Sequence, residues 1–252
     1  MATETASKPA TVADATAAAD EAAEAIRLEH LTRRYGERDA LADVTTALAR
    51  GQTLAVLGRN GAGKTTLLRV LATLLFPHAG LVRVLGLELP REAHALRGRV
   101  GMLGHETLLY RDLTARENLL FYARLYEVPS PEARVAELLE STGMARRAAE
   151  PVRNLSRGMA QRVAVCRTVL HRPELLLLDE PHAHLDPEAA ALVEPLIGRA
   201  AAVTRVLVSH DVEQALEEAD RVMGLRDGRV VVDAPAGEVT PHFVQTVYGG
   251  AR

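Results

Sequence analysis

The most constraining feature of this sequence is a glycine-rich segment that joins a short apolar run to a longer periodic one. Residues 53–57 read TLAVL, residues 58–66 read GRNGAGKTT, and apolar residues then continue at helical spacing through Leu75. A short apolar run bounded by glycine is typical of a buried strand, and the periodic run predicts a helix that ends just before Pro77. Strand, tight turn and helix in this order form a building unit of α/β folds.

The glycine-rich segment has the spacing of a phosphate-binding loop, with four residues between Gly58 and Gly63. Glycine lets the backbone approach an anion closely, and the N-terminus of the following helix favours negative charge. We expect Lys64 to reach the β- and γ-phosphates of a nucleotide and the Thr65 hydroxyl to coordinate Mg²⁺. A chance match is the alternative, but the flanking strand and helix argue against it. The predicted nucleotide-binding residues are Gly58, Arg59, Asn60, Gly61, Ala62, Gly63, Lys64, Thr65 and Thr66.

A second apolar run, Leu175–Leu178, ends in the adjacent carboxylates Asp179 and Glu180. Four consecutive leucines are typical of a central parallel strand that is buried on both faces. Adjacent side chains on a strand point in opposite directions, so the two acids can have different roles. We expect Asp179 to hold Mg²⁺ and Glu180 to orient and deprotonate an attacking water. Alone, such a pair is unspecific and could cap the next loop; together with the phosphate-binding loop it indicates phosphoryl chemistry.

A third segment, residues 155–159 with the sequence LSRGM, precedes an amphipathic helix that ends before Pro173. Ser156 and Gly158 predict a second anion site, made of a hydroxyl, backbone amides and a helix N-terminus. An ordinary serine cap is the alternative for this segment taken alone. The order along the chain favours the anion site, because HLD at residues 184–186 and SHD at residues 209–211 complete a full set.

Alternating strand and helix patterns predict an α/β core with a parallel sheet, and hairpins near both ends predict a smaller antiparallel part. Thr114–Glu117, TARE, predicts a capping box at a helix start. We expect residues 1–25 to form a disordered, alanine-rich tail and residues 26–234 to form an ATP-binding domain. Within it, a helical subdomain is predicted at about residues 106–171, and residues 235–252 are predicted to be a C-terminal extension.

Composition limits the classes of partner. The formal net charge of −3 indicates no basic field for nucleic acid. No apolar run approaches the roughly 18 residues needed to span a bilayer, and the N-terminus lacks the pattern of a secretory signal. The single cysteine, Cys166, fits a reducing compartment and is predicted to lie in the core. A membrane role would therefore need a separate membrane-spanning partner.

Taken together, these segments resemble those of the ATP-binding cassette (ABC) family over about residues 26–234. The family signature usually reads LSGGQ, so Arg157 and Met159 depart from it while Leu155, Ser156 and Gly158 match. The resemblance implies a P-loop NTPase (RecA-like) parallel sheet core with an antiparallel β subdomain and a helical signature subdomain. It also implies an ATPase that uses ATP and Mg²⁺.

The resemblance assigns roles to further residues. Asp186 matches the D-loop of the family, and His210 matches the switch histidine that contacts the γ-phosphate. Tyr35 lies where the family places an aromatic residue that stacks on adenine; a tyrosine at a strand end is the alternative. His105 lies where most members have a glutamine that reaches Mg²⁺ and the attacking water, so it is predicted to be a catalytic and metal-contacting residue.

Family resemblance also implies partners. Two ATPase subunits, expected here to be a homodimer, pair head to tail so that each ATP lies between the phosphate-binding loop of one and the signature of the other. The dimer would work in the cytoplasm, peripheral on the inner face of the cell membrane, against integral membrane permease subunits. No nucleic acid is expected.

The segment from His105 to Tyr126 is similar to the ATPase subunit of the bacterial haem exporter used in cytochrome c maturation. Haem export is therefore predicted, and a drug, multidrug or other exporter remains the alternative because its ATPase has a similar segment. A histidine also titrates near neutral pH, which raises the hypothesis of pH-sensitive coupling; a substitution with an unchanged role is the simpler interpretation.

Two other classes are disfavoured. Soluble ABC proteins that act on nucleic acid or ribosomes usually join two cassettes in one chain or insert a long coiled coil, and neither pattern is present. A nucleotide kinase or GTPase would have no use for the signature. His182 and His184 lie two residues apart, but their ligand set is incomplete and no metal site is predicted there.

Overall fold

The computed structural model describes residues 23–240, 243 and 247–249, and within these residues the strands form two sheets. One is antiparallel, with the order β2-β1-β4-β5, and the other has the order β10-β9-β3-β8-β7-β6. The strands of the first sheet are β1 (Glu24–Tyr35), β2 (Arg38–Ala49), β4 (Ala79–Val84) and β5 (Leu87–Leu89). Those of the second are β3 (Thr53–Leu57), β6 (Val100–Leu103), β7 (Leu175–Asp179), β8 (Thr204–Val208), β9 (Arg221–Arg226) and β10 (Arg229–Pro235).

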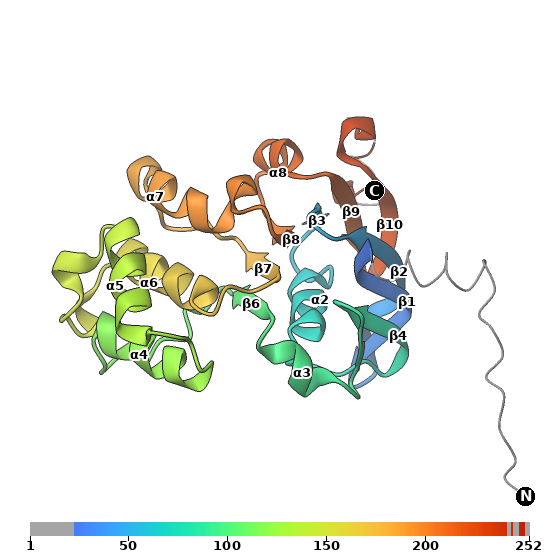
Figure 1. Ribbon diagram of the computed structural model, residues 1–252. Helices are drawn as coiled ribbons and strands as arrows, with labels where there is room; N and C mark the ends of the chain where they lie inside the picture. The colour runs from blue at the N-terminus through green and yellow to red at the C-terminus, as the bar shows by residue number, and fades with distance from the viewer. Residues whose placement is uncertain (1–22, 241–242, 244–246, 250–252) are drawn as a thin grey trace, which may run out of the picture.

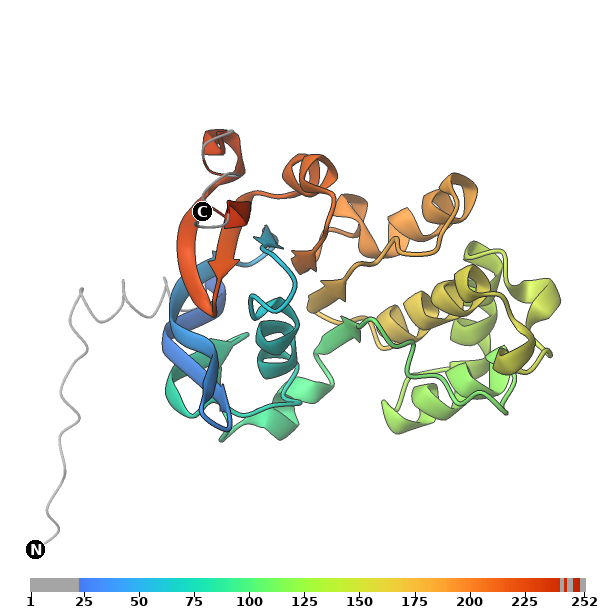
Figure 2. The same cartoon turned by 180° about the vertical axis from the view of Figure 1, so that it is seen from behind.

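Strand pairing in the second sheet is parallel from β6 to β9, and only the β9–β10 hairpin is antiparallel. The predicted α/β class with a parallel core and an antiparallel part is confirmed. The helices are α2 (Lys64–Leu71), α3 (Ala93–Arg97), α4 (Ala115–Leu125), α5 (Pro131–Ser141), α6 (Arg157–Val169), α7 (Pro187–Ile197) and α8 (Val212–Glu218). In both views α4 and α5 lie at the opposite end of the molecule from β1 and β2 (Figure 1, Figure 2).

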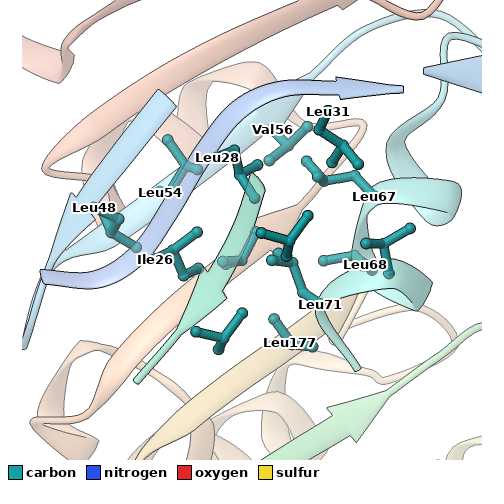
Figure 3. Packing of buried hydrophobic residues seen from close by; sticks show 14 of the residues in the cluster. Ile26, Leu28, Leu31, Leu48, Leu54, Val56, Leu67, Leu68, Leu71 and Leu177 are labelled. Carbon is teal, nitrogen blue, oxygen red and sulfur yellow. The ribbon is translucent and has the colours of Figure 1, made fainter. Parts of the chain in front are cut away.

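Strand β7 explains the run of four leucines, because alternate side chains enter different cores. Leu175 and Leu177 belong to the cluster that α2 forms with both sheets, whereas Leu176 and Leu178 belong to the cluster of helices α4–α7. Figure 3 shows part of the first cluster, with residues of β1, β2, β3 and α2 and with Leu177 at the lower edge of the view. A strand buried on both faces needs no polar alternation. The two cores therefore meet at β7, directly before the predicted catalytic acids.

Helices α4, α5 and α6 form the region predicted as helical. The capping box is confirmed: Thr114 Oγ1 accepts a hydrogen bond from the Glu117 amide at 3.1 Å, and Glu117 Oε2 accepts one from the Thr114 amide at 2.8 Å. Cys166 is fully buried in the second cluster, as predicted for a core residue. Burial raises the pKa of its thiol to about 11. None of the helices in the described part of the chain combines the length and apolar character needed to cross a bilayer.

Two predicted boundaries are wrong. The helix after the phosphate-binding loop ends at Leu71, well before Pro77, because Thr73 adopts a left-handed conformation with φ of 61°. The predicted tail, residues 1–25, includes two residues of β1: Glu24 pairs with Ala49, and Ala25 is buried in the first cluster. The rest of that tail, residues 1–22, lies outside the described residues. The hairpin predicted near the N-terminus was not given residue bounds for its second strand; that strand is β2, and its burial alternates as expected for a half-buried strand.

Candidate active site

A pocket of about 410 Å³ lies at one edge of the parallel sheet. It is lined by the loop after β3 and the start of α2, by the carboxyl end of β7, by a residue that follows β8, and by the end of β1 and the start of β2. Parallel strands end at the same edge of a sheet, so residues distant in sequence meet there. The lining residues are Tyr35, Arg38, Ala40, Asn60, Gly61, Gly63, Lys64, Thr65, Thr66, Asp179, Glu180 and His210. Ten of these twelve were predicted from the sequence, so the structure brings most of the expected nucleotide site together.

Glycines in the phosphate-binding loop adopt backbone conformations that other residues rarely reach. Gly58, Gly61 and Gly63 have φ angles of 154°, 81° and 110°. A Cβ atom at Gly63 would also collide with the backbone carbonyl of Ala40, and one at Gly58 would collide with the carbonyl of Leu225. The loop therefore presents backbone groups that no side chain covers at these glycines, as an anion site requires.

Lys64 is 7% exposed at the start of α2. Its Nζ donates hydrogen bonds to the carbonyls of Gly58 at 2.6 Å and Arg59 at 3.1 Å. Burial lowers the pKa of the Lys64 ammonium, and the carboxylates of Asp179 and Glu180 partly oppose this shift. The pocket therefore holds a buried cation whose bonds in this structure are to backbone carbonyls, and which a phosphate would stabilise.

Thr65 and Asp179 supply adjacent oxygen atoms. The Thr65 hydroxyl donates to Asp179 Oδ2 at 3.0 Å, and Asp179 is 6% exposed at the end of β7. Burial raises the pKa of the Asp179 carboxyl, while the hydrogen bond from Thr65 opposes the shift. A hydroxyl and a carboxylate side by side are hard oxygen ligands, so these two residues fit Mg²⁺ chemically.

Glu180 pairs with His210, since His210 Nε2 lies 2.6 Å from Glu180 Oε1. The Glu180 backbone is left-handed, with φ of 54°, and its amide donates to the Val208 carbonyl at 2.9 Å. A left-handed non-glycine residue is costly and persists only where the surrounding structure fixes it. The pairing with β8 therefore holds the acid at the pocket, next to the histidine that follows that strand.

Tyr35 lines the pocket from the end of β1 and is 47% exposed. The Arg33 guanidinium lies 5.3 Å from the centroid of the Tyr35 ring. Prediction missed Arg38 and Ala40, which line the pocket from β2. Arg38 is opposite Tyr35 in the β1–β2 register, so assigning residues to the second strand of the predicted N-terminal hairpin would have identified it.

His105 follows β6 and is exposed, and it is not among the described residues that line the pocket. Burial is the largest influence on the pKa of Asp179 and raises it, and His105 is the smallest of the influences that lower it. Strand β6 is tied to α6, because the Met102 carbonyl accepts hydrogen bonds from Arg167 Nη2 at 2.7 Å and Thr168 Oγ1 at 3.2 Å. The helix that begins at the signature thus contacts the strand that precedes His105.

None of the signature residues is among the described residues that line the pocket: Leu155, Ser156, Arg157, Gly158 and Met159 lie at the start of α6 instead. Ser156 is exposed and caps α6, accepting a hydrogen bond from the Met159 amide at 3.2 Å. A Cβ atom at Gly158 would lie 2.8 Å from the His184 carbonyl. The serine cap that the sequence offered as the simpler alternative is therefore present, and the signature packs against the neighbouring HLD segment.

The HLD segment itself begins α7. Asp186 caps this helix by accepting a hydrogen bond from the Ala189 amide at 2.8 Å. His182 uses both ring nitrogens within the protein, with Nδ1 3.2 Å from Gln214 Nε2 and Nε2 3.4 Å from Glu194 Oε2. His182 is thus occupied by contacts to α8 and α7.

Comparison with known proteins gives consistent results. The family model described as ABC transporter matches residues 41–183. The daunorubicin resistance ATP-binding protein of Streptomyces coeruleorubidus is 39% identical over 221 residues, 85% of this chain and 69% of that protein. A phosphonates import ATP-binding protein of Frankia casuarinae is 39% identical over 232 residues, 85% of this chain and 92% of that protein. A dimeric ATP-binding cassette in a post-hydrolysis state with ADP and Pi aligns with a TM-score of 0.76 and 25% identity, covering 84% of this chain and 98% of that structure.

Proposed function

The chain belongs to the ABC transporter family, whose ATP-binding subunits hydrolyse ATP, and from this premise we propose that it powers an exporter through separate membrane permease subunits. One observation carries the catalytic part of the proposal. Lys64, Thr65, Asp179, Glu180 and His210 line one pocket of about 410 Å³ although they come from three distant parts of the sequence. Such a combination of cation, oxygen ligands and base is what phosphoryl transfer to water requires.

In the proposed mechanism, Lys64 exchanges its bonds to the Gly58 and Arg59 carbonyls for the β- and γ-phosphates of ATP. Thr65 and Asp179 would hold Mg²⁺, and the bound ion would supply positive charge near the phosphates. Glu180 is paired with His210 at 2.6 Å. A γ-phosphate offers His210 a stronger acceptor, so His210 turns to it and leaves the Glu180 carboxylate to orient and deprotonate the attacking water.

We propose that two copies of the chain act together. Ser156 and the N-terminus of α6 carry the predicted features of an anion site, but the pocket around Lys64 is lined by other residues. A head-to-tail homodimer would place the signature of one copy over the phosphate-binding loop of the other, and Asp186 near the new interface. The relative that aligns by structure is dimeric.

A second groove, separate from the pocket around Lys64, supports a permease partner. It has a volume of about 710 Å³ and lies between the end of α2, α3, β6 and α4. Leu74, Leu108 and Leu125 line it and are 60%, 49% and 64% exposed. Exposed apolar side chains around one groove are typical of a protein interface. We propose that a cytoplasmic segment of the permease binds there, which would hold the chain at the inner face of the membrane.

Cargo is proposed at a coarser level than the sequence predicted. The relatives include a daunorubicin resistance protein and a phosphonates import protein at equal identity, so the ATP-binding subunit itself varies little with cargo. We propose export of a small organic molecule, because the similarity of residues 105–126 to exporter ATPases agrees with the resistance relative. Haem export stays a prediction that rests on that segment alone.

Affinity purification of the tagged full-length chain from membranes tests the transporter role. Recovery of an integral membrane subunit is expected, and recovery of nucleic acid or of no membrane protein would contradict it. Leu125→Asp should abolish that recovery while the isolated chain keeps its ATPase activity, because Leu125 is 64% exposed. Ala191→Asp, on the exposed side of α7 and outside the groove, is the matched control and should retain the permease.

A further inference from the structure

The described C-terminal residues pack against the sheet that carries the phosphate-binding loop. Phe243 is 7% exposed and Val247 is fully buried, and both belong to a third cluster with Ala55 and Leu57 of β3. The C-terminal extension predicted from the sequence is therefore anchored, in its described residues, to the strand that leads directly into the loop. None of the motifs found in the sequence explains this packing.

The C-terminal residues pack against strand β9. A Cβ atom at Gly224 would collide with the Val247 side chain, so the glycine leaves the space that Val247 fills. Gly224 pairs with Leu57 in the parallel register between β9 and β3. The next residue, Leu225, places its carbonyl against Gly58, where a Cβ atom would collide with it. One short stretch of β9 thus contacts both the C-terminal segment and the first glycine of the loop.

Tyr248 completes the contact. The Gly58 amide donates a hydrogen bond to Tyr248 Oη at 3.2 Å. Gly58 has φ of 154°, a conformation that glycine tolerates. Glycine has no side chain whose contacts could fix this conformation. Its carbonyl accepts the hydrogen bond from Lys64 at 2.6 Å. The two peptide groups on either side of Gly58 are therefore fixed by Tyr248 on one side and by Lys64 on the other.

We propose that Tyr248 is a positioning residue that holds the first peptide group of the phosphate-binding loop in the orientation needed for nucleotide binding. The proposal rests on the proposed function, because it assumes that ATP occupies this loop. When ATP draws Lys64 toward the phosphates, Gly58 loses its contact with that ammonium group, and the bond to Tyr248 remains to hold the backbone. Burial raises the pKa of the Tyr248 phenol, so the hydroxyl stays neutral at physiological pH. Tyr248 acts through Gly58 and does not itself contact the nucleotide.

Tyr248→Phe removes the hydroxyl and keeps the ring. Loss of one such hydrogen bond should raise the KM for ATP and the Kd for a nonhydrolysable ATP analogue by about three- to tenfold. The kcat should stay within about twofold, since Glu180 and His210 are untouched. Amide hydrogen exchange at Gly58 should accelerate in the nucleotide-free variant.

Phe243→Leu is the control, because it weakens the packing of the same segment without removing the hydroxyl. It should lower the thermal midpoint and leave the KM and the exchange rate at Gly58 unchanged. A Tyr248→Phe variant with wild-type KM and Gly58 exchange would overturn the proposal, as would a Phe243→Leu variant with the same KM increase. A wild-type chain that binds no nucleotide would instead overturn the proposed function.

Discussion

Two helix N-termini carry the predicted anion-binding residues of this molecule, and they differ in how their backbone amides are used. Helix α2 follows Gly63, which has φ of 110° and offers no side chain to cap the helix. Helix α6 follows Ser156, whose hydroxyl accepts a hydrogen bond from the Met159 amide at 3.2 Å. The first turn of α2 is therefore left for a ligand, whereas that of α6 is partly satisfied within the chain.

Their surroundings differ in the same sense. Lys64 and Asp179 are 7% and 6% exposed, so α2 begins among buried charges that need a partner. Ser156 and Arg157 at the start of α6 are exposed. The buried opposite charges at the start of α2 fit a site formed within one chain. The exposed start of α6 fits a surface that contacts another molecule. This contrast agrees with the proposal that one chain holds the chemistry and that a second copy of the chain completes the enclosure of the nucleotide.

Glu180→Gln should have the largest effect of these substitutions. It should impair the site at the start of α2 and leave the start of α6 unchanged. Replacing the proposed base removes proton transfer, so kcat should fall by about 10²–10⁴-fold while ATP binding is retained. ATP should then accumulate a dimer, detectable by light scattering after size exclusion. Glu188→Gln, at an exposed position in the first turn of α7, is the control and should keep normal turnover. Near-normal hydrolysis by Glu180→Gln would remove Glu180 from the role of base.

Ser156→Ala should separate the two helix ends. We expect hydrolysis to fall by about 10- to 100-fold, the size expected for a lost hydrogen bond to a charged group. Binding of ATP to the isolated chain should be unchanged, because Ser156 is not among the described residues that line the pocket. Loss of the cap should also reduce the free energy of unfolding by about 0.5–2 kcal/mol.

Mixing variants gives a sharper form of this test. Lys64→Ala disables the phosphate-binding loop and Ser156→Ala weakens the signature, so each homodimer should keep at most about a tenth of wild-type activity. In a head-to-tail heterodimer, one of the two sites combines the intact loop of one copy with the intact signature of the other. An equimolar mixture should therefore recover roughly a quarter of wild-type activity. A mixture as inactive as its components would contradict the shared site.

Asp179→Asn should stabilise the nucleotide-free chain while it abolishes Mg²⁺-dependent turnover. Burial raises the pKa of the Asp179 carboxyl above its ordinary value of 3.8, so the fold disfavours the charged form. The loss of folding free energy from the buried charge is fully present above the raised pKa. It disappears as the pH falls, when the carboxyl is protonated in both the folded and the unfolded chain. Urea unfolding should show a higher midpoint for the variant near neutral pH and equal midpoints in acid. Asp112→Asn, with a side chain that is 89% exposed, should give no such gain.

The same contrast between the helix ends explains what the sequence could predict. Residues 58–66 were predictable because a phosphate-binding loop needs glycine, lysine and threonine at fixed spacing, whatever the rest of the chain does. The strand Leu175–Asp179 was predictable because burial on both faces leaves an unbroken apolar run. Each of these signals lies within a short stretch of sequence, and each belongs to the pocket at the start of α2.

What prediction missed depends on contacts between distant segments. Arg38 enters the pocket only because β2 pairs with β1, and Tyr248 reaches Gly58 across 190 positions of sequence. The helix after the loop ends at Leu71 because Thr73 turns left-handed, and no residue type in that turn demands it. The site roles assigned to individual residues therefore remain proposals for the variants above to test.

His105→Gln should have the smallest effect. It tests whether protonation of His105 affects the coupling between the pocket at the start of α2 and the signature at the start of α6. His105 is exposed and is not among the described residues that line the pocket. It is also the weakest of the influences on the pKa of Asp179, which burial raises. Glutamine can replace its hydrogen-bonding capacity with one donor and one acceptor group. We therefore expect kcat/KM to stay within about threefold, and the pH profiles of ATPase activity to superimpose between about pH 5.5 and 8.

A divergence of the two profiles on the acid side would contradict this expectation, because glutamine does not titrate. The same comparison in the purified complex with its permease sharpens the test, since β6, which precedes His105, is bonded to α6 through Arg167 and Thr168. If the profiles diverge only in the complex, the proton acts on communication between the signature helix and the permease, and the pocket around Lys64 is not its target. If they coincide in both, the histidine serves by its position at the end of β6.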